Sequence, residues 1–148
     1  MSGISKRLKV QGFTLVEIMI VIAINVVLGA LTVPSLMRSR LNANEAAAIA
    51  ALKTISSVSV MYRTTYSTYP ASIGALYDPN GAQYIDSILA SGSKQGYNFS
   101  VSGDQDNFNA SAVPSKANVT GGRYFFLDQN GVIRSSNNGP ADMSSPAL

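Results

Sequence analysis

The chain has 148 residues, of which 46% are hydrophobic and only 13% are charged. A soluble domain normally has about a quarter of its residues charged, so the apolar excess is expected to be concentrated in one segment. The chain contains no cysteine and no histidine, which excludes disulfides, thiolate and imidazole metal ligands, and catalysis by thiols or imidazoles. We therefore expect neither an enzyme nor a bound cofactor or metal.

The net charge of +3 arises at the N-terminal end of the chain. Lys6, Arg7 and Lys9 lie in the first twelve residues, and the remaining eight basic residues balance the eight acidic ones. No stripe of lysine and arginine is left to neutralise a phosphate backbone. The charge distribution therefore predicts no nucleic-acid binding.

Residues 13–33 read FTLVEIMIVIAINVVLGALTV and contain one charged residue, Glu17. As a helix this segment is about 31 Å long, which matches the hydrocarbon core of a bilayer. A secretory signal peptide is the alternative, but the run exceeds an apolar region of roughly 7–15 residues and no good A-x-A cleavage site follows it. We predict a leader peptide at 1–12 and a single span at 13–34, with the basic leader in the cytoplasm.

Glu17 is an unusual residue for such a span. A carboxylate in hydrocarbon costs several kcal/mol unless it is paired, and no basic residue lies within two turns of it inside the apolar run. Its partner is therefore expected from another chain or from processing. Cleavage between Gly12 and Phe13 would create an amine one helical turn away, which Glu17 of a neighbouring copy could accept. Such pairing would set the axial register of stacked helices, as a buried polar residue does in a coiled coil.

The leader that ends in Gly12, the run Phe13-Thr14-Leu15-Val16-Glu17, the apolar helix and Pro34 together resemble the N-terminus of type IV pilins and pseudopilins. The resemblance implies that a prepilin peptidase cleaves after Gly12 and methylates the new amine of Phe13. It also implies that Glu17 pairs with that amine during filament assembly.

Two further residues are expected to soften the helix. Gly29 lowers its stability, and Pro34 lacks the N–H group that would continue the ladder, so we expect a kink or an unwound turn there. Asn25 and Val26 stand where pilins of this type usually have an aliphatic residue and a glycine. Asn25 is expected to make an interhelical polar contact or to weaken the helix locally.

Residues 35–66 have apolar positions at helical spacing, which predicts an amphipathic helix with one buried stripe. Within it, Glu45 is expected to be exposed or to face another subunit, with Arg38 and Arg40 as its partners. Residues 67–94 are interpreted as a connecting αβ region, with a short helix over 82–90. The Asp104–Asn107 run is interpreted as a solvated turn rather than a calcium site.

Residues 95–135 alternate with period two, which predicts four antiparallel strands; these cover 97–102, 108–112, 123–127 and 132–134. The tyrosines and phenylalanines are expected to fill the core rather than to conduct electrons. Residues 136–148 are interpreted as a flexible tail. The expected fold class is α+β, a long N-terminal helix packed on a four-stranded antiparallel sheet, which is also the fold that the resemblance to pilins implies.

The resemblance implies a structural subunit of a type IV pilus filament that supports motility, adhesion or DNA uptake. Its partners would be further copies of itself, the prepilin peptidase and the pilus assembly machinery. It would be stored in the inner membrane as a single-pass precursor and then form an extracellular filament. A pseudopilin of a type II secretion system is the first alternative, although no calcium-binding C-terminal loop is visible in the sequence. A single-pass anchored periplasmic binding module is the second.

Overall fold

The computed structural model describes residues 12–148, so most of the expected leader lies outside the described residues. The elements are, in order, α1 (Leu15–Tyr66), the 3₁₀-helix η1 (Ile73–Leu76), α2 (Ser87–Ala90), β1 (Ser93–Lys94), β2 (Tyr97–Gly103), β3 (Phe108–Pro114), β4 (Tyr124–Asp128) and β5 (Ile133–Ser136). The chain divides into two compact units after Leu36, and each is described by itself.

The first unit is the apolar beginning of α1. It has the length and composition of a membrane span, and none of its most apolar window is buried by the protein. Large apolar side chains such as Leu15, Met19 and Leu31 are more than half exposed. Because water does not tolerate a continuous apolar surface of this size, lipid or other helices must cover it.

The helix is continuous through Gly29 and Pro34, so the unwound turn expected there is absent from the described chain. A proline inside a helix removes one N–H donor, and at Pro34 this is the donor that would bond the Ala30 carbonyl. The hydroxyl of Thr32 donates to the carbonyl oxygens of Leu28 and Gly29, at 3.1 and 3.3 Å, and so does not replace the missing bond. A kink at Gly29 and Pro34 stays a prediction.

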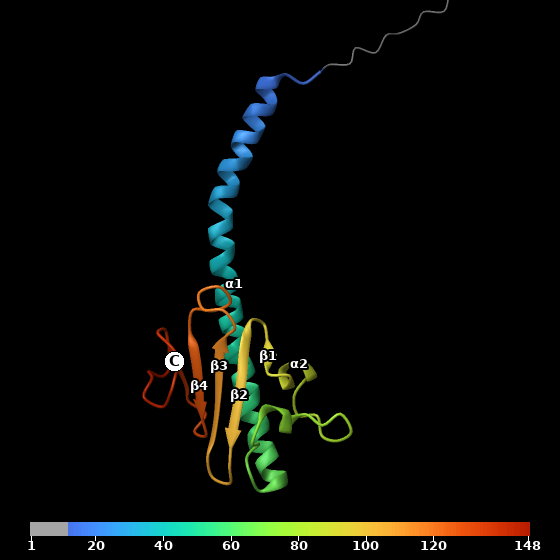
Figure 1. Cartoon of the computed structure of the whole chain (residues 1–148), viewed down its shortest axis with the longest axis vertical. Coiled ribbons are helices and arrows are strands. Elements are labelled where there is room, and N and C mark those ends of the chain that lie inside the picture. Colours follow the sequence, from blue (N-terminus) through green and yellow to red (C-terminus); the bar gives the residue numbers. More distant parts are fainter. Residues whose placement is uncertain (1–11) are drawn as a thin grey trace, which may run out of the picture. The chain divides into compact units, whose positions relative to one another are not determined.

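The second unit, residues 37–148, contains an antiparallel sheet of five strands in the order β1-β2-β3-β4-β5. Strands β1 to β4 are labelled in Figure 1. The α+β class is confirmed, but the sheet has one strand more than expected. The additional strand, β1, is only two residues long and pairs Ser93 with Asn98. Its turn places Gln95 and Gly96 at positive φ, 49° and 77°, as in a type I′ hairpin. A strand this short has no periodicity to reveal it.

The short helix expected over 82–90 is present only as α2, Ser87–Ala90. Residues 82–86 instead form an isolated bridge at Gln83 followed by bends. The side chain of Asp86 then caps the helix and accepts the N–H of Leu89 at 3.3 Å. A cap requires non-helical backbone at its own position. The prediction was therefore wrong for residues 82–86.

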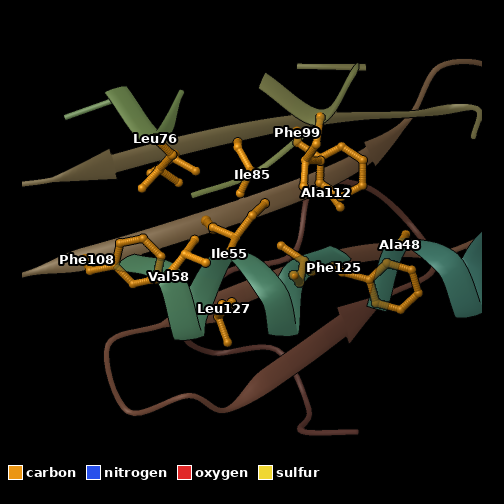
Figure 2. Packing of buried hydrophobic residues seen from close by; sticks show 14 of the residues in the cluster. Ala48, Ile55, Val58, Leu76, Ile85, Phe99, Phe108, Ala112, Phe125 and Leu127 are labelled. Carbon is orange, nitrogen blue, oxygen red and sulfur yellow. The ribbon is translucent and has the colours of Figure 1, made fainter. Parts of the chain in front are cut away.

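The core lies between α1 and one face of the sheet (Figure 2). The helix contributes Ala48, Leu52, Ile55 and Val58, all at most 9% exposed. The strands contribute four buried aromatic residues, as expected, and these are Tyr97, Phe99, Phe108 and Phe125. Leu76 and Ile85, from the connecting region, belong to the same cluster.

The segment after β5 is more ordered than the expected flexible tail. Ser135 N–H donates to the Pro146 carbonyl and Leu148 N–H to the Ile133 carbonyl, both at 2.9 Å. Arg134 and Ala147 form an antiparallel bridge. The exposed edge of β5 supplies backbone donors and acceptors that hold this segment. A composition rich in Ser, Asn and Pro gives no sign of such pairing.

Replacing Gly121 with alanine is expected to lower the free energy of unfolding by about 2 kcal/mol, because the new methyl group would overlap the Tyr97 hydroxyl and force repacking. Tyr97 is fully buried and cannot swing outward. Urea unfolding of the detergent-solubilised chain, followed by near-UV circular dichroism, measures this loss. The control is Gly74→Ala, where the nearest atom to the added methyl is 3.9 Å away; equal midpoints for both variants would contradict the prediction.

Candidate functional site

The expected cleavage position lies just before the first helix. Gly12, Phe13 and Thr14 have no regular secondary structure, and α1 begins at Leu15. The Phe13 side chain is 82% exposed. A methyl group added at Gly12 would meet no atom of residues 12–148 within 4 Å, so contacts in this part of the chain do not require glycine there. A requirement for glycine would therefore come from an enzyme that reads this segment.

Glu17 and Thr14 cap the helix reciprocally. One carboxylate oxygen, Oε2, accepts the N–H and the hydroxyl of Thr14, both at 2.9 Å. In return the Glu17 N–H donates to Thr14 Oγ1 at 3.2 Å. This is a capping box, which satisfies two donors that a helix N-terminus otherwise leaves free.

The capping box gives Glu17 hydrogen-bond partners at its own helix end, but Thr14 is uncharged, so an ionic partner from another chain or from processing stays a prediction. The signal for the capping box is present in the sequence as the T-x-x-E spacing of Thr14 and Glu17, which a search for ionic partners alone overlooks. Among the described residues the second oxygen, Oε1, has no hydrogen-bond partner. The carboxylate can therefore cap its own helix with one oxygen and still accept an external donor with the other.

Asn25 occupies the middle of the apolar run. Its side-chain amide donates to the Val21 carbonyl at 2.8 Å, which leaves the backbone ladder intact. Asn25 is exposed, and its amide oxygen has no partner among residues 12–148. An interhelical contact through that oxygen stays a prediction.

Glu45 is buried, 7% exposed, rather than exposed as expected. It accepts the N–H of Gly122 at 2.9 Å, the N–H of Arg123 at 3.2 Å and the Arg123 Nε at 2.8 Å. Arg123, and not Arg38 or Arg40, is its ionic partner in the described chain. The prediction failed because the partners lie 77 and 78 residues away in sequence, where only the fold can bring them. We call Glu45, Gly122 and Arg123 the helix–loop clamp.

Burial raises the pKa of Glu45, but the N–H groups of Gly122 and Arg123 and the positive charge of Arg123 outweigh burial and hold the pKa below its usual value of 4.5. Such a carboxylate prefers the charged form in the folded chain. Nearby, burial raises the pKa of Tyr97 to about 12, so its hydroxyl stays protonated and donates to the Arg123 carbonyl at 2.9 Å.

Low pH is expected to destabilise the second unit, residues 37–148, by protonating Glu45. A carboxyl group whose pKa is lower in the folded than in the unfolded chain adds stability above its unfolded pKa, and that stability is lost as the pH falls through the folded value. The free energy of unfolding should therefore fall as the pH drops below about 4.5, the ordinary pKa of glutamate. Urea midpoints measured between neutral pH and pH 3 test this. The loss should be smaller in Glu45→Gln, and an identical pH dependence in both proteins would contradict the prediction.

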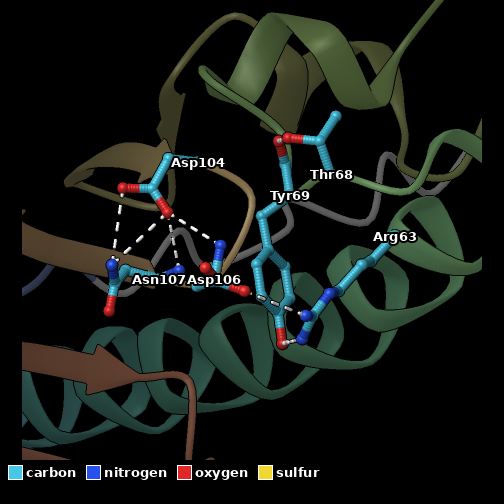
Figure 3. A network of polar contacts seen from close by, with 6 residues as sticks. All are labelled: Arg63, Thr68, Tyr69, Asp104, Asp106 and Asn107. Carbon is cyan, nitrogen blue, oxygen red and sulfur yellow. Dashed lines mark hydrogen bonds and ion pairs between the residues drawn. The ribbon is translucent and has the colours of Figure 1, made fainter.

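The turn between β2 and β3 is tied to the end of α1 (Figure 3). Asp104 Oδ1 accepts the N–H groups of Asp106 and Asn107, at 2.9 and 2.7 Å. Arg63 lies over the Tyr69 ring at 4.7 Å and within 3.6 Å of the Asp106 carboxylate. The carboxylates thus serve a turn and an ion pair, and residues 12–148 contain no group of three or more acidic side chains arranged for a metal.

Comparison with known proteins gives two matches. Residues 7–32 match the family described as the prokaryotic N-terminal methylation motif. The chain is also 34% identical over 89 residues to the type II secretion system core protein G of Escherichia coli (strain K12). That alignment covers 60% of this chain and 61% of the relative, so the chain spans about three-fifths of the length of the relative that it matches.

Proposed function

Because the chain belongs to the superfamily of type IV pilins and pseudopilins, we propose that its mature form, residues 13–148, is the structural subunit of a type IV pilus filament. The observation that carries the proposal is the beginning of α1. An apolar helix that the protein leaves uncovered starts at a capping box, directly after an exposed segment that contains the expected cleavage position.

The proposed pathway uses each of these features in turn. The span stores the precursor in the inner membrane, with the basic leader in the cytoplasm. A prepilin peptidase cleaves between Gly12 and Phe13 and methylates the new amine, which keeps its positive charge. During assembly, Glu17 of one copy accepts the amine of a neighbour through the oxygen that the cap leaves free. Packing of the apolar helices supplies the assembly free energy.

A pseudopilin of a type II secretion system is the second candidate. It is favoured by the similarity to core protein G, which extends beyond the methylation motif because 89 residues align whereas the motif covers residues 7–32. The two candidates share processing and helix packing but differ in where the filament resides. A pilus extends from the cell surface, whereas a pseudopilus stays in the periplasm.

The test is the N-terminal sequence and intact mass of the protein in mechanically sheared surface material. A start at Phe13 with one added methyl group is expected. The same mature protein found only in the periplasm and membrane would support the pseudopilin instead. A start at Met1, or at Leu31 after a conventional signal cleavage, would exclude both filament roles.

A variant checks that processing depends on the proposed position. Gly12→Val is expected to leave the leader uncleaved, so that the full-length precursor accumulates in the membrane and no surface filament forms. Gly29→Ala is the matched control, because it changes a glycine in the following helix where an added methyl also meets no atom within 4 Å. Normal cleavage of Gly12→Val would show that the peptidase reads another position.

A further inference from the structure

One end of the second unit combines exposed apolar and cationic side chains. Met37, Arg40 and Leu41 of α1 and Asn118 and Val119 of the β3–β4 connection line a recess of about 160 Å³. Met37 is 56% and Val119 is 59% exposed. A single exposed apolar side chain is ordinary at a protein surface, but several that gather around one recess indicate a contact surface.

The loop that carries Val119 is held firmly in place. Asn44 of α1 donates to the Thr120 carbonyl at 2.8 Å, and Thr120 Oγ1 accepts the Lys116 N–H at 3.1 Å. The helix–loop clamp fixes the next residues onto the same helix. Val119 is therefore presented by a braced loop and is not exposed through loop mobility.

The position of this surface along the chain indicates what covers it. Met37 follows Val33 by only four residues in the sequence, so the covalent chain keeps Met37 near the end of the span. Neither Arg38 nor Arg40 has a carboxylate within ion-pair distance among the described residues, and both are exposed. Cations and apolar side chains that follow a span so closely in sequence fit the headgroup region of a bilayer, where the cations meet phosphate and the apolar groups meet acyl chains.

We propose that Met37, Arg38, Arg40 and Val119 form a lipid-docking face, which rests on the phosphate headgroups of the bilayer that holds the span. The proposal depends on the membrane-stored precursor proposed above, but not on which filament the protein enters. Docking holds the second unit, residues 37–148, against the membrane before assembly. A copy that enters a filament must then give up these headgroup contacts together with its lipid-covered helix.

The chain contains no tryptophan, so Val119→Trp introduces a unique fluorescent probe. The full-length variant is reconstituted into vesicles that contain anionic phospholipid and a lipid brominated near the headgroup. Its emission is expected to shift to shorter wavelength and to be quenched about twofold more than that of the control, since interfacial groups penetrate roughly 5–10 Å. The control is Gln105→Trp, an exposed position in the turn at the opposite end of β3.

Adding Arg38→Gln and Arg40→Gln to Val119→Trp tests the role of phosphate. Loss of two cations near an anionic surface is expected to weaken the docking equilibrium about 30-fold, and the quenching should fall to the level of the Gln105→Trp control. Quenching that persists in this variant, or that equals the control before the arginines are changed, would overturn the proposal.

Two further measurements distinguish lipid from a second copy of the chain and check the span itself. If the shielding of Val119→Trp disappears when the protein is diluted to about one chain per vesicle, a second copy covers this face and the lipid proposal is wrong. Ile24→Trp reports on the span and should be quenched by lipid brominated deep in the acyl chains. Without that quenching the membrane-stored precursor fails, and the docking proposal fails with it; quenching at Ile24→Trp but not at Val119→Trp overturns docking alone.

Discussion

Replacing Glu17 with leucine is expected to abolish filament assembly and to leave membrane insertion intact. Leucine makes the span more apolar, so insertion becomes more favourable. The change also removes the acceptor for a neighbour's amine and breaks the capping box with Thr14. The measurement compares the yield of sheared filaments with the amount of protein in the membrane fraction. Unchanged filament yield would exclude the proposed role of Glu17 in assembly.

Two variants separate the cap from the charge. Glu17→Gln keeps a side chain that can complete a capping box but loses the negative charge, so we expect assembly to fail as in Glu17→Leu. Thr14→Ala removes the hydroxyl that both donates to and accepts from Glu17, at a cost of about 1 kcal/mol for the lost cap, and should still assemble. If Glu17→Gln assembles normally, the charge does not set the register and the cap alone is sufficient.

Ile24→Leu is the matched control for these substitutions. It alters another exposed residue of the same apolar run without changing charge, capping or hydropathy by much. Normal filament yield from this variant shows that the loss in Glu17→Leu reflects the carboxylate. A failure of the control would instead indicate that packing along the whole helix is sensitive to any change.

Replacing Glu45 with alanine is expected to cost about 3 kcal/mol of the free energy of unfolding. The change removes the acceptor of three hydrogen bonds, from the N–H groups of Gly122 and Arg123 and from the Arg123 side chain. Each such bond contributes about 1 kcal/mol or somewhat more because the acceptor is charged, whereas the Arg123 side chain is 37% exposed and can be solvated after the change. Urea unfolding of the detergent-solubilised chain measures the change.

A double-mutant cycle with Arg123→Ala isolates the ionic part of the helix–loop clamp. Because Glu45 also accepts two backbone N–H groups, Glu45→Ala should remain more destabilising than Arg123→Ala. Lys94→Ala provides the comparison, since it removes the partly exposed Asp86–Lys94 pair at 3.0 Å and leaves the Asp86 cap of α2 in place. Exposed pairs contribute about 0–1 kcal/mol. Equal effects of Glu45→Ala and Lys94→Ala would show that the clamp contributes no more than a surface contact.

The sequence alone was sufficient for the features that depend on neighbouring residues. The apolar run, the basic residues before it, and the order of Gly12, Phe13 and Glu17 are local patterns, and a membrane span is recognised by length and composition. Strand alternation likewise predicted β2 to β5, because one buried face imposes a period of two. The T-x-x-E spacing of Thr14 and Glu17 also indicates a capping box, which a search restricted to ionic partners of Glu17 does not find.

Only the tertiary structure decided the features that join distant segments. Glu45 meets Gly122 and Arg123 across 77 and 78 residues, so its burial could not follow from the residues around it. The final residues pair with β5 through backbone groups. Because nearly all residues have the same backbone donor and acceptor, the sequence does not indicate this pairing. Val119 lies beside Met37 for the same reason. Periodicity reports which face of an element is buried, but the partner that buries it is selected by the packing of the whole chain.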